Sequence, residues 1–115
     1  MSKIYDYRNI NIIVQENENV TVKVEFPDAG TIGYTFINIP GSDDKGIANE
    51  GTEIIGKGKD LKTDITIITS NPYNIAPEID KIRVNIFVND NKIVEHSNDK
   101  TEENKPQIIA LLTFK

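Results

Sequence analysis

The clearest pattern of apolar and polar positions lies between residues 80 and 96. In its first half, apolar residues alternate with charged or amide residues, which is the period of a half-buried β-strand. The apolar positions on one side are Ile82, Val84, Ile86 and Val88. Phe87 is the single apolar residue on the other side. Residues 89–91, Asn-Asp-Asn, tolerate turn conformations, so the pattern predicts a β-hairpin with Phe87 on its polar face.

The register of this hairpin depends on the length of its turn. A three-residue loop, residues 89–91, places Ile86 opposite Val94 and keeps apolar with apolar across the two strands. The same register places Phe87 opposite Ile93. A two-residue loop of residues 90–91 would put an isoleucine opposite a glutamate. We therefore favour the three-residue loop.

Further strands follow from the same alternation along the chain. Residues 9–15 and 20–26 flank a polar run at 16–19, so they are expected to form a second hairpin. Residues 61–70 are a threonine-rich amphipathic strand. Residues 1–8, where Tyr and charged residues alternate, are expected to form an edge strand or an N-terminal arm.

Two segments are apolar on both sides of an extended chain. Residues 31–39 are therefore expected to form a central strand, at least part of which is covered on both faces, and residues 108–112 are expected to be buried on both faces. Between these strands, residues 40–51 are rich in glycine and charge and predict an irregular loop. Residues 71–77 contain two prolines and predict a crossing connection. Residues 98–105 are polar throughout and predict a mobile loop.

The identity of the apolar residues favours strands over helices. The chain has 20 isoleucines but only 3 leucines, 4 alanines and 1 methionine. β-Branched residues fit pleated sheets, and good helix formers are scarce. The 115 residues are enough for one core and too few for two domains. The sequence predicts a single all-β domain, residues 1–115, folded as an antiparallel immunoglobulin-like or jelly-roll-like β-sandwich of about seven to eight strands.

Charge and composition exclude several classes of partner and site. The net charge of −5 opposes binding to nucleic acid or to anionic lipid, so neither is expected as a partner. There are no cysteines, which excludes disulfides, thiolate zinc sites and cysteine nucleophiles. No export leader or long apolar segment is visible, so the chain as it stands is expected in the cytoplasm, or outside the cell if a leader was removed.

Catalytic, cofactor-binding and metal sites are not expected. His96 is the only histidine, and the serines lack the context of a nucleophile elbow. Residues 51–58 resemble a phosphate-binding loop but lack its hydroxyl and the helix that must follow. The paired carboxylates Asp43 and Asp44 lack a calcium-loop spacing, and calcium binding by loop carboxylates stays an alternative.

The function expected from these exclusions is that of a non-enzymatic protein–protein interaction or structural assembly module. Its partner would be another protein or a second copy of the chain. An acidic inhibitor or immunity-type protein that neutralises a partner enzyme or toxin is the alternative. A hydrolase or a metal- or sugar-binding domain is a third and weaker alternative. The candidate interaction surface consists of Tyr5, Tyr7, Tyr73, Phe87 and Ile93.

The order of signals over residues 55–91 is a further observation. It runs I-G-x-G-x-D-L, an alternating Ile/Thr strand, N-P, and then strand-turn-strand. This order resembles that of small bacterial β-sandwich proteins of undefined function and covers about a third of the chain. The resemblance implies a sandwich fold and no particular site.

Overall fold

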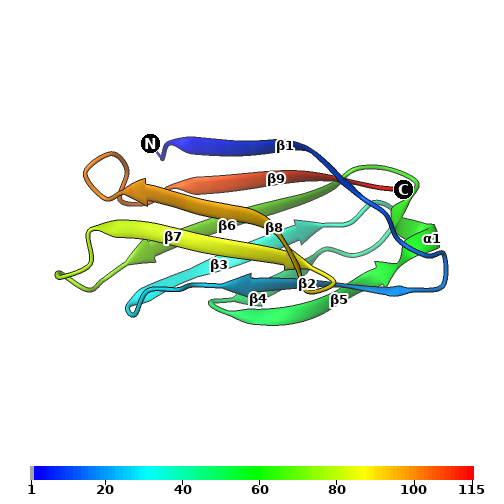
Figure 1. Ribbon diagram of the computed structural model, residues 1–115, viewed down its shortest axis with the longest axis horizontal. Helices are drawn as coiled ribbons and strands as arrows, with labels where there is room; N and C mark the ends of the chain where they lie inside the picture. The colour runs from blue at the N-terminus through cyan, green and yellow to red at the C-terminus, as the bar shows by residue number, and fades with distance from the viewer. Residues whose placement is uncertain (1) are drawn as a thin grey trace.

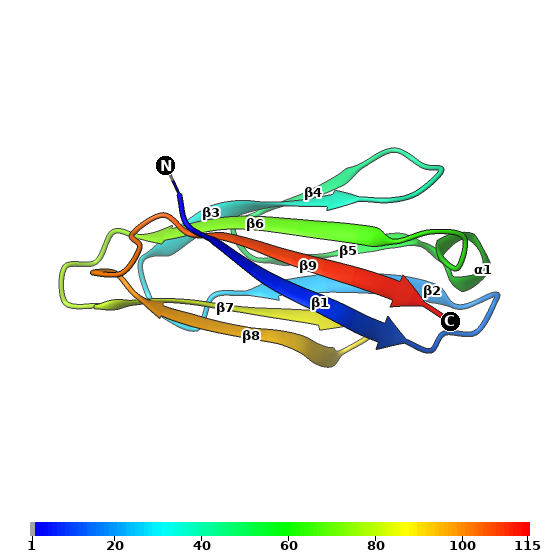
Figure 2. The same ribbon diagram turned by 90° about the horizontal axis from the view of Figure 1, so that it is seen from above.

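The chain forms two β-sheets that pack face to face around an apolar core. The computed structural model describes residues 2–115. Sheet A has five strands in the order β1-β9-β6-β3-β4, and sheet B has four in the order β5-β2-β7-β8. Figure 2 shows them as layers, with β3, β4 and β6 on one side and β2, β7 and β8 on the other. The predicted all-β class with two packed sheets is confirmed.

The elements are labelled in Figure 1. Their bounds are β1 Ile4–Ile12, β2 Asn19–Glu25, β3 Thr31–Asn38, β4 Lys45–Ala48, β5 Gly51–Lys57, α1 Gly58–Leu61, β6 Thr66–Asn74, β7 Lys81–Val88, β8 Asn91–Asp99 and β9 Gln107–Phe114. The expected count of seven to eight strands was too low because β4 lies inside the segment predicted to be an irregular loop. This short strand pairs with β3 and buries Ile47 between the sheets.

The predicted hairpin at residues 80–96 is confirmed as β7 and β8. The two strands pair antiparallel with Ile86 opposite Val94, as the alternation predicted. The residues of β7 expected to face the core, Ile82, Val84, Ile86 and Val88, are all buried.

The turn of this hairpin is one residue shorter than predicted. It consists of Asn89 and Asp90, whose φ angles of 48° and 67° are those that a two-residue hairpin loop requires. Phe87 then lies opposite Lys92, and the predicted pairing of Phe87 with Ile93 is wrong. A β-bulge at Ile93 absorbs the difference and restores the predicted register beyond it.

The second predicted hairpin is not formed. β1 pairs in parallel with β9, whereas β2 lies between β5 and β7 in the other sheet. Figure 1 shows β1 and β9 side by side and running in the same direction. The polar run at residues 16–19 is therefore the crossing between the sheets, and the amides of Gly58 and Lys59 donate to its carbonyls.

β3 lies inside sheet A, between β6 and β4, as expected of a central strand, but the expected coverage of both its faces fails at Tyr34 and Phe36. Phe36 is 53% exposed and Tyr34 is 41% exposed on the face that points away from sheet B. In β9, Ile109 and Leu111 are half-buried on the same outer face. Among residues 2–115 the only helix is the single turn α1, so no helix covers this face. No helix in the described part of the chain is long and apolar enough to span a membrane.

Candidate interaction surface

The outer face of sheet A brings together apolar side chains from three neighbouring strands. Across these strands, Phe36 of β3 lies opposite Thr69 of β6, which lies opposite Ile109 of β9. The next row contains Ile67 opposite Leu111. We call the whole set the sheet A face. It consists of the outward residues Ile32, Tyr34, Phe36, Asn38, Ile67, Thr69, Asn71, Tyr73, Gln107, Ile109, Leu111 and Thr113.

Two aromatic rings project from this face over β3. The ring centroids of Tyr34 and Phe36 are 4.6 Å apart. The outward residues of the neighbouring strand β4 are Gly46 and Ala48, which are too small to flank the rings. A side chain at Gly46 would collide with the Tyr34 ring, so this glycine gives the tyrosine its place. The Tyr34 ring therefore lies over Gly46 of β4, and Phe36 packs beside it.

A shallow depression lies beside Phe36. Its volume is about 360 Å³, and it is lined by Phe36, Asn38, Asp44, Ile67, Thr69, Asn71 and Gln107. The depression follows from the row Phe36–Thr69–Ile109, because threonine is shorter than either of its neighbours. The sheet A face thus has a projecting ring next to a hollow.

The two outer faces of the sandwich differ in charge. None of the residues of the sheet A face, all of which lie within residues 2–115, is charged. On the edge strand β1 the same outer side continues with Asp6, which lies opposite Ile109 and pairs with Arg8 at 3.3 Å. The outer face of sheet B is instead mostly ionic, and its charged residues are Lys23, Glu25, Lys81, Arg83, Lys92, Glu95 and Asp99. Large uncharged and partly apolar faces mark contact sites, whereas scattered ions mark a solvated surface.

Two of the predicted surface residues lie on opposite outer faces. Tyr73 belongs to the sheet A face and is 37% exposed, with Lys105 Nζ 5.7 Å from the centre of its ring. Phe87 is half-buried on the outer face of sheet B, where Lys23 Nζ lies 4.9 Å from its ring centre. The structure does not bring these two aromatic residues together.

The other three predicted surface residues point inward. Tyr5, Tyr7 and Ile93 are half-buried and pack against the core. Sequence reasoning missed the larger surface around Tyr34 and Phe36, because apolar residues on both sides of a strand were interpreted as burial on both sides. Each sheet of the sandwich buries one face against the other sheet, and a chain without long helices has no further element to cover the outer face.

His96 occupies the gap between the edge strands of the two sheets. Its ring is only 2% exposed, and Tyr5 packs edge-on against it with centroids 4.6 Å apart. Its Nε2 lies 2.7 Å from Oδ1 of Asn98, which is an acceptor, so Nε2 carries the hydrogen. The Tyr7 hydroxyl then donates to Nδ1 at 2.7 Å. With both nitrogens satisfied, the ring ties β1 to β8 and is closed to solvent.

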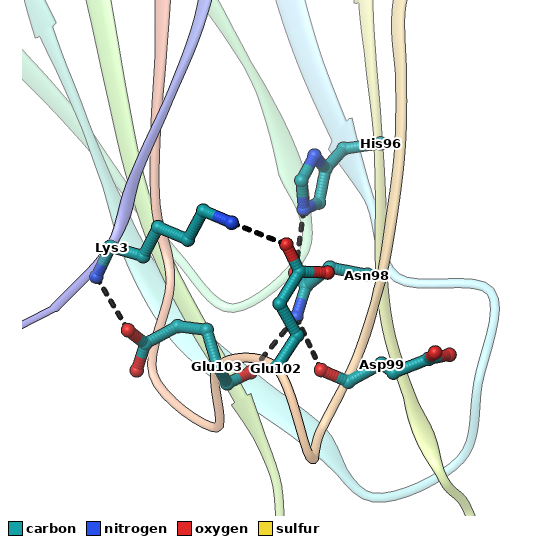
Figure 3. A network of polar contacts seen from close by, with 6 residues as sticks. All are labelled: Lys3, His96, Asn98, Asp99, Glu102 and Glu103. Atoms are coloured by element: carbon teal, nitrogen blue, oxygen red, sulfur yellow. Dashed lines mark hydrogen bonds and ion pairs between the residues drawn. The ribbon is translucent and has the colours of Figure 1, made fainter.

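Asn98 connects this buried ring to the loop between β8 and β9 (Figure 3). Its Nδ2 donates to the carbonyls of Asp99 and Glu103, both at 2.9 Å. The same loop holds the segment before β1, because Lys3 donates its amide to the Glu103 carboxylate and its Nζ to Glu102. Residues 98–105, predicted to be a mobile loop, thus begin inside β8 and are bonded to the start of β1.

The pKa of His96 is lowered from its usual value near 6.5. Burial is the main cause, because a protonated ring would be held away from water; the hydrogen bond to Asn98 and the charge of Glu102 oppose the shift. In the pH range between the lowered pKa and 6.5, the unfolded chain binds more protons than the folded one. The contribution of His96 to stability is therefore complete above pH 6.5 and is lost as the pH falls through the lowered pKa.

We expect the melting temperature of the protein to fall between pH 7 and pH 5, and to fall less in a His96→Gln variant. The carboxyls with lowered pKa values, such as Asp28 and Glu95, lose their contribution only below about pH 4.5, so they do not interfere in this range. Thermal unfolding followed by circular dichroism across this range measures the effect. An identical pH dependence in both proteins would contradict it.

Other predicted chemistry can be placed in the structure. Residues 51–57, part of the phosphate-loop lookalike, form strand β5. Within residues 2–115, no group of three or more histidine and carboxylate side chains is arranged to hold a metal ion.

Comparison with protein-family models and with curated proteins found no match to this chain.

Proposed function

We propose that this protein is a non-enzymatic interaction or assembly module whose contact surface is the sheet A face. The observation that supports this is the absence of charge from that face, within the described residues 2–115, in a chain of which 27% is charged. Burial of apolar surface contributes about 25 cal/mol per Å², and uncharged groups enter a contact without leaving an ion unpaired. A partner would therefore gain most by covering this face.

The alternative of an acidic inhibitor has less support. Such a protein would present free carboxylates to a basic partner. Several outward carboxylates already have basic neighbours: Lys81 donates to Asp99 at 2.6 Å and Lys92 donates to Glu95 at 2.8 Å. Asp99 and Glu95 would have to leave these partners before binding another protein.

The finer architecture is also part of the proposal. We infer that the sandwich is closer to the immunoglobulin-like than to the jelly-roll-like arrangement. In immunoglobulin domains the second and fifth strands are neighbours in one sheet, and the third and sixth are neighbours in the other. β3 and β6 are neighbours in sheet A in the same way, whereas β2 lies between β5 and the seventh strand, β7. The resemblance to an immunoglobulin domain concerns which strands are neighbours in a sheet. It does not extend to the order of the strands along the chain, because β6 precedes β7.

A capture experiment tests the proposed function. Wild-type protein, a Phe36→Lys variant and a Phe87→Lys variant are immobilised and exposed to lysate from the source and to untagged copies of the chain. Proteins that use the sheet A face are expected to be retained by the wild type and by Phe87→Lys, and to be lost from Phe36→Lys. Equal retention by all three proteins, or by none, would refute the proposal.

A further inference from the structure

We infer that the partner of the sheet A face is a second copy of this chain, in a two-fold symmetric dimer with the two faces packed together. The inference rests on the proposed function and specifies its partner. Four properties of the structure support it: the size of the face, its neutrality, its shape, and the protection of the sheet edges.

The size of the face matches that of a stable contact. β3 and β9 have eight residues each in a five-stranded sheet. With a rise of about 3.3 Å per residue and a spacing of about 4.8 Å between strands, the outer side of all five strands, which is the sheet A face together with the flanking residues of β1 and β4, spans at most roughly 26 by 24 Å. Its flat area of roughly 600 Å², enlarged by projecting side chains, approaches the roughly 800 Å² that each partner buries in a stable interface.

The neutrality of the face suits a second copy of an acidic protein. Two chains with a net charge of −5 repel each other. The sheet A face has no charged residue that would meet a residue of the same charge in the second copy. The ionic outer face of sheet B points away from the partner. Four charged residues flank the face: Asp6 and Arg8 on β1, which are paired with each other at 3.3 Å, Asp44 beside the depression, and Lys105 near the Tyr73 ring. A partner with a charged surface would instead leave its ions without counterparts.

The shape of the face is complementary to itself. The Phe36 ring projects beside the depression of about 360 Å³ over Thr69. A two-fold axis between the ring and the hollow would insert Phe36 of each copy into the depression of the other. Twisted sheets pack face to face about 10 Å apart with strands inclined by about 30°, so the geometry is an ordinary one for two β-sheets.

Three of the four sheet edges are poor sites for association. β4, at one edge of sheet A, has only four residues. β1, at the other edge, is interrupted by an irregularity between Tyr7 and Ile10, where Asn9 has a φ of 61°. The edge strand β8 carries Lys92, Glu95 and Asp99. Bulges, short length and charge all discourage pairing between edges. Face-to-face packing, in contrast, closes on itself after two copies.

Sedimentation velocity of the purified protein, from micromolar to millimolar concentration, tests this dimer. We expect the wild type and the Phe87→Lys control to dimerise alike. Phe36→Lys places a lysine in the contact of both copies, and Thr69→Trp fills both depressions; each should weaken dimerisation roughly tenfold or more. Circular dichroism melting of each variant identifies any that fails to fold.

Two results would overturn the inference. The first is a wild-type protein that remains monomeric up to millimolar concentration. The second is a dimer that Phe36→Lys and Thr69→Trp, both folded, leave intact. A monomer that still captures another protein through Phe36 would refute the dimer and leave the proposed function standing. A monomer with no capture that depends on Phe36 would refute both.

Discussion

Replacing Ile86 with alanine is expected to lower the free energy of unfolding by about 2–5 kcal/mol, which is the usual cost of emptying a core position. Ile86 is fully buried at the centre of sheet B, with Val24 of β2 on one side and Val94 of β8 on the other. These neighbours are held in two hydrogen-bonded ladders and cannot collapse into the space. Urea unfolding at neutral pH, followed by circular dichroism, measures the loss.

The control for this substitution is the next residue in the same strand. Phe87 is half-buried on the outer face, in contact with the ammonium group of Lys23. A Phe87→Ser variant loses that partial burial and a cation–π contact worth about 0.5–1 kcal/mol, so a smaller loss of stability than that of Ile86→Ala is expected. An equal or larger loss would mean that the outer face of sheet B is packed more tightly than the structure shows.

The second large effect is expected from Asn98→Ala. Asn98 is only 5% exposed and makes three hydrogen bonds, to the His96 ring and to the carbonyls of Asp99 and Glu103. Its removal leaves a buried N–H without an acceptor and two carbonyls without a donor. An unsatisfied buried group costs about 1–3 kcal/mol, and a total of about 3 kcal/mol is expected because water can reach part of the loop.

The matched control for this variant is Asn91→Ala. Asn91 lies in the same strand β8 but is exposed, and its side chain makes only a 3.4 Å contact to a neighbouring carbonyl. Urea unfolding of both variants is the measurement. If both substitutions changed the free energy of unfolding by the same small amount, the link from His96 to the loop would not contribute to stability.

Features that depend on neighbouring residues could be predicted from the sequence. The hairpin of β7 and β8 follows from alternation and a turn of asparagine and aspartate, and Ile86 lies opposite Val94 as expected. The predicted turn length was wrong because the predicted register paired the two strands residue for residue, without a β-bulge. A β-bulge at Ile93 allows the favoured two-residue turn and the favoured pairing of apolar residues together.

Features that depend on distant residues were outside the reach of local patterns. Parallel pairing needs only two extended segments and a connection of sufficient length. The sequences of residues 4–12 and 107–114 therefore do not predict that β1 and β9 pair in parallel. The orientation of β6 shows the same limit. Ile65 and Ile67 alternate with Thr66 and Ile68, and the structure buries Thr66 and Ile68.

The candidate surface was only partly accessible from the sequence. Tyr73 was selected as an exposed aromatic residue and lies on the sheet A face, whereas Tyr34 and Phe36 were assigned to a covered strand. The alternation of β3 shows two apolar sides but not which side meets sheet B. Only the three-dimensional arrangement reveals that threonines such as Thr35 point inward, where its hydroxyl pairs with Ser70 at 2.9 Å, while the aromatic rings point outward.

The parallel pairing of β1 with β9 has a consequence for biosynthesis. Ile4 pairs with Gln107 and Ile12 pairs with Phe114, so β1 cannot enter its sheet until β9, about 100 residues later in the chain, has been synthesised. Such long-range pairing slows folding and prolongs the exposure of unpaired strands. Until β9 arrives, Tyr5 and Tyr7 have no fixed place beside His96. Sheet A can therefore be completed only after residues 107–114 have been synthesised.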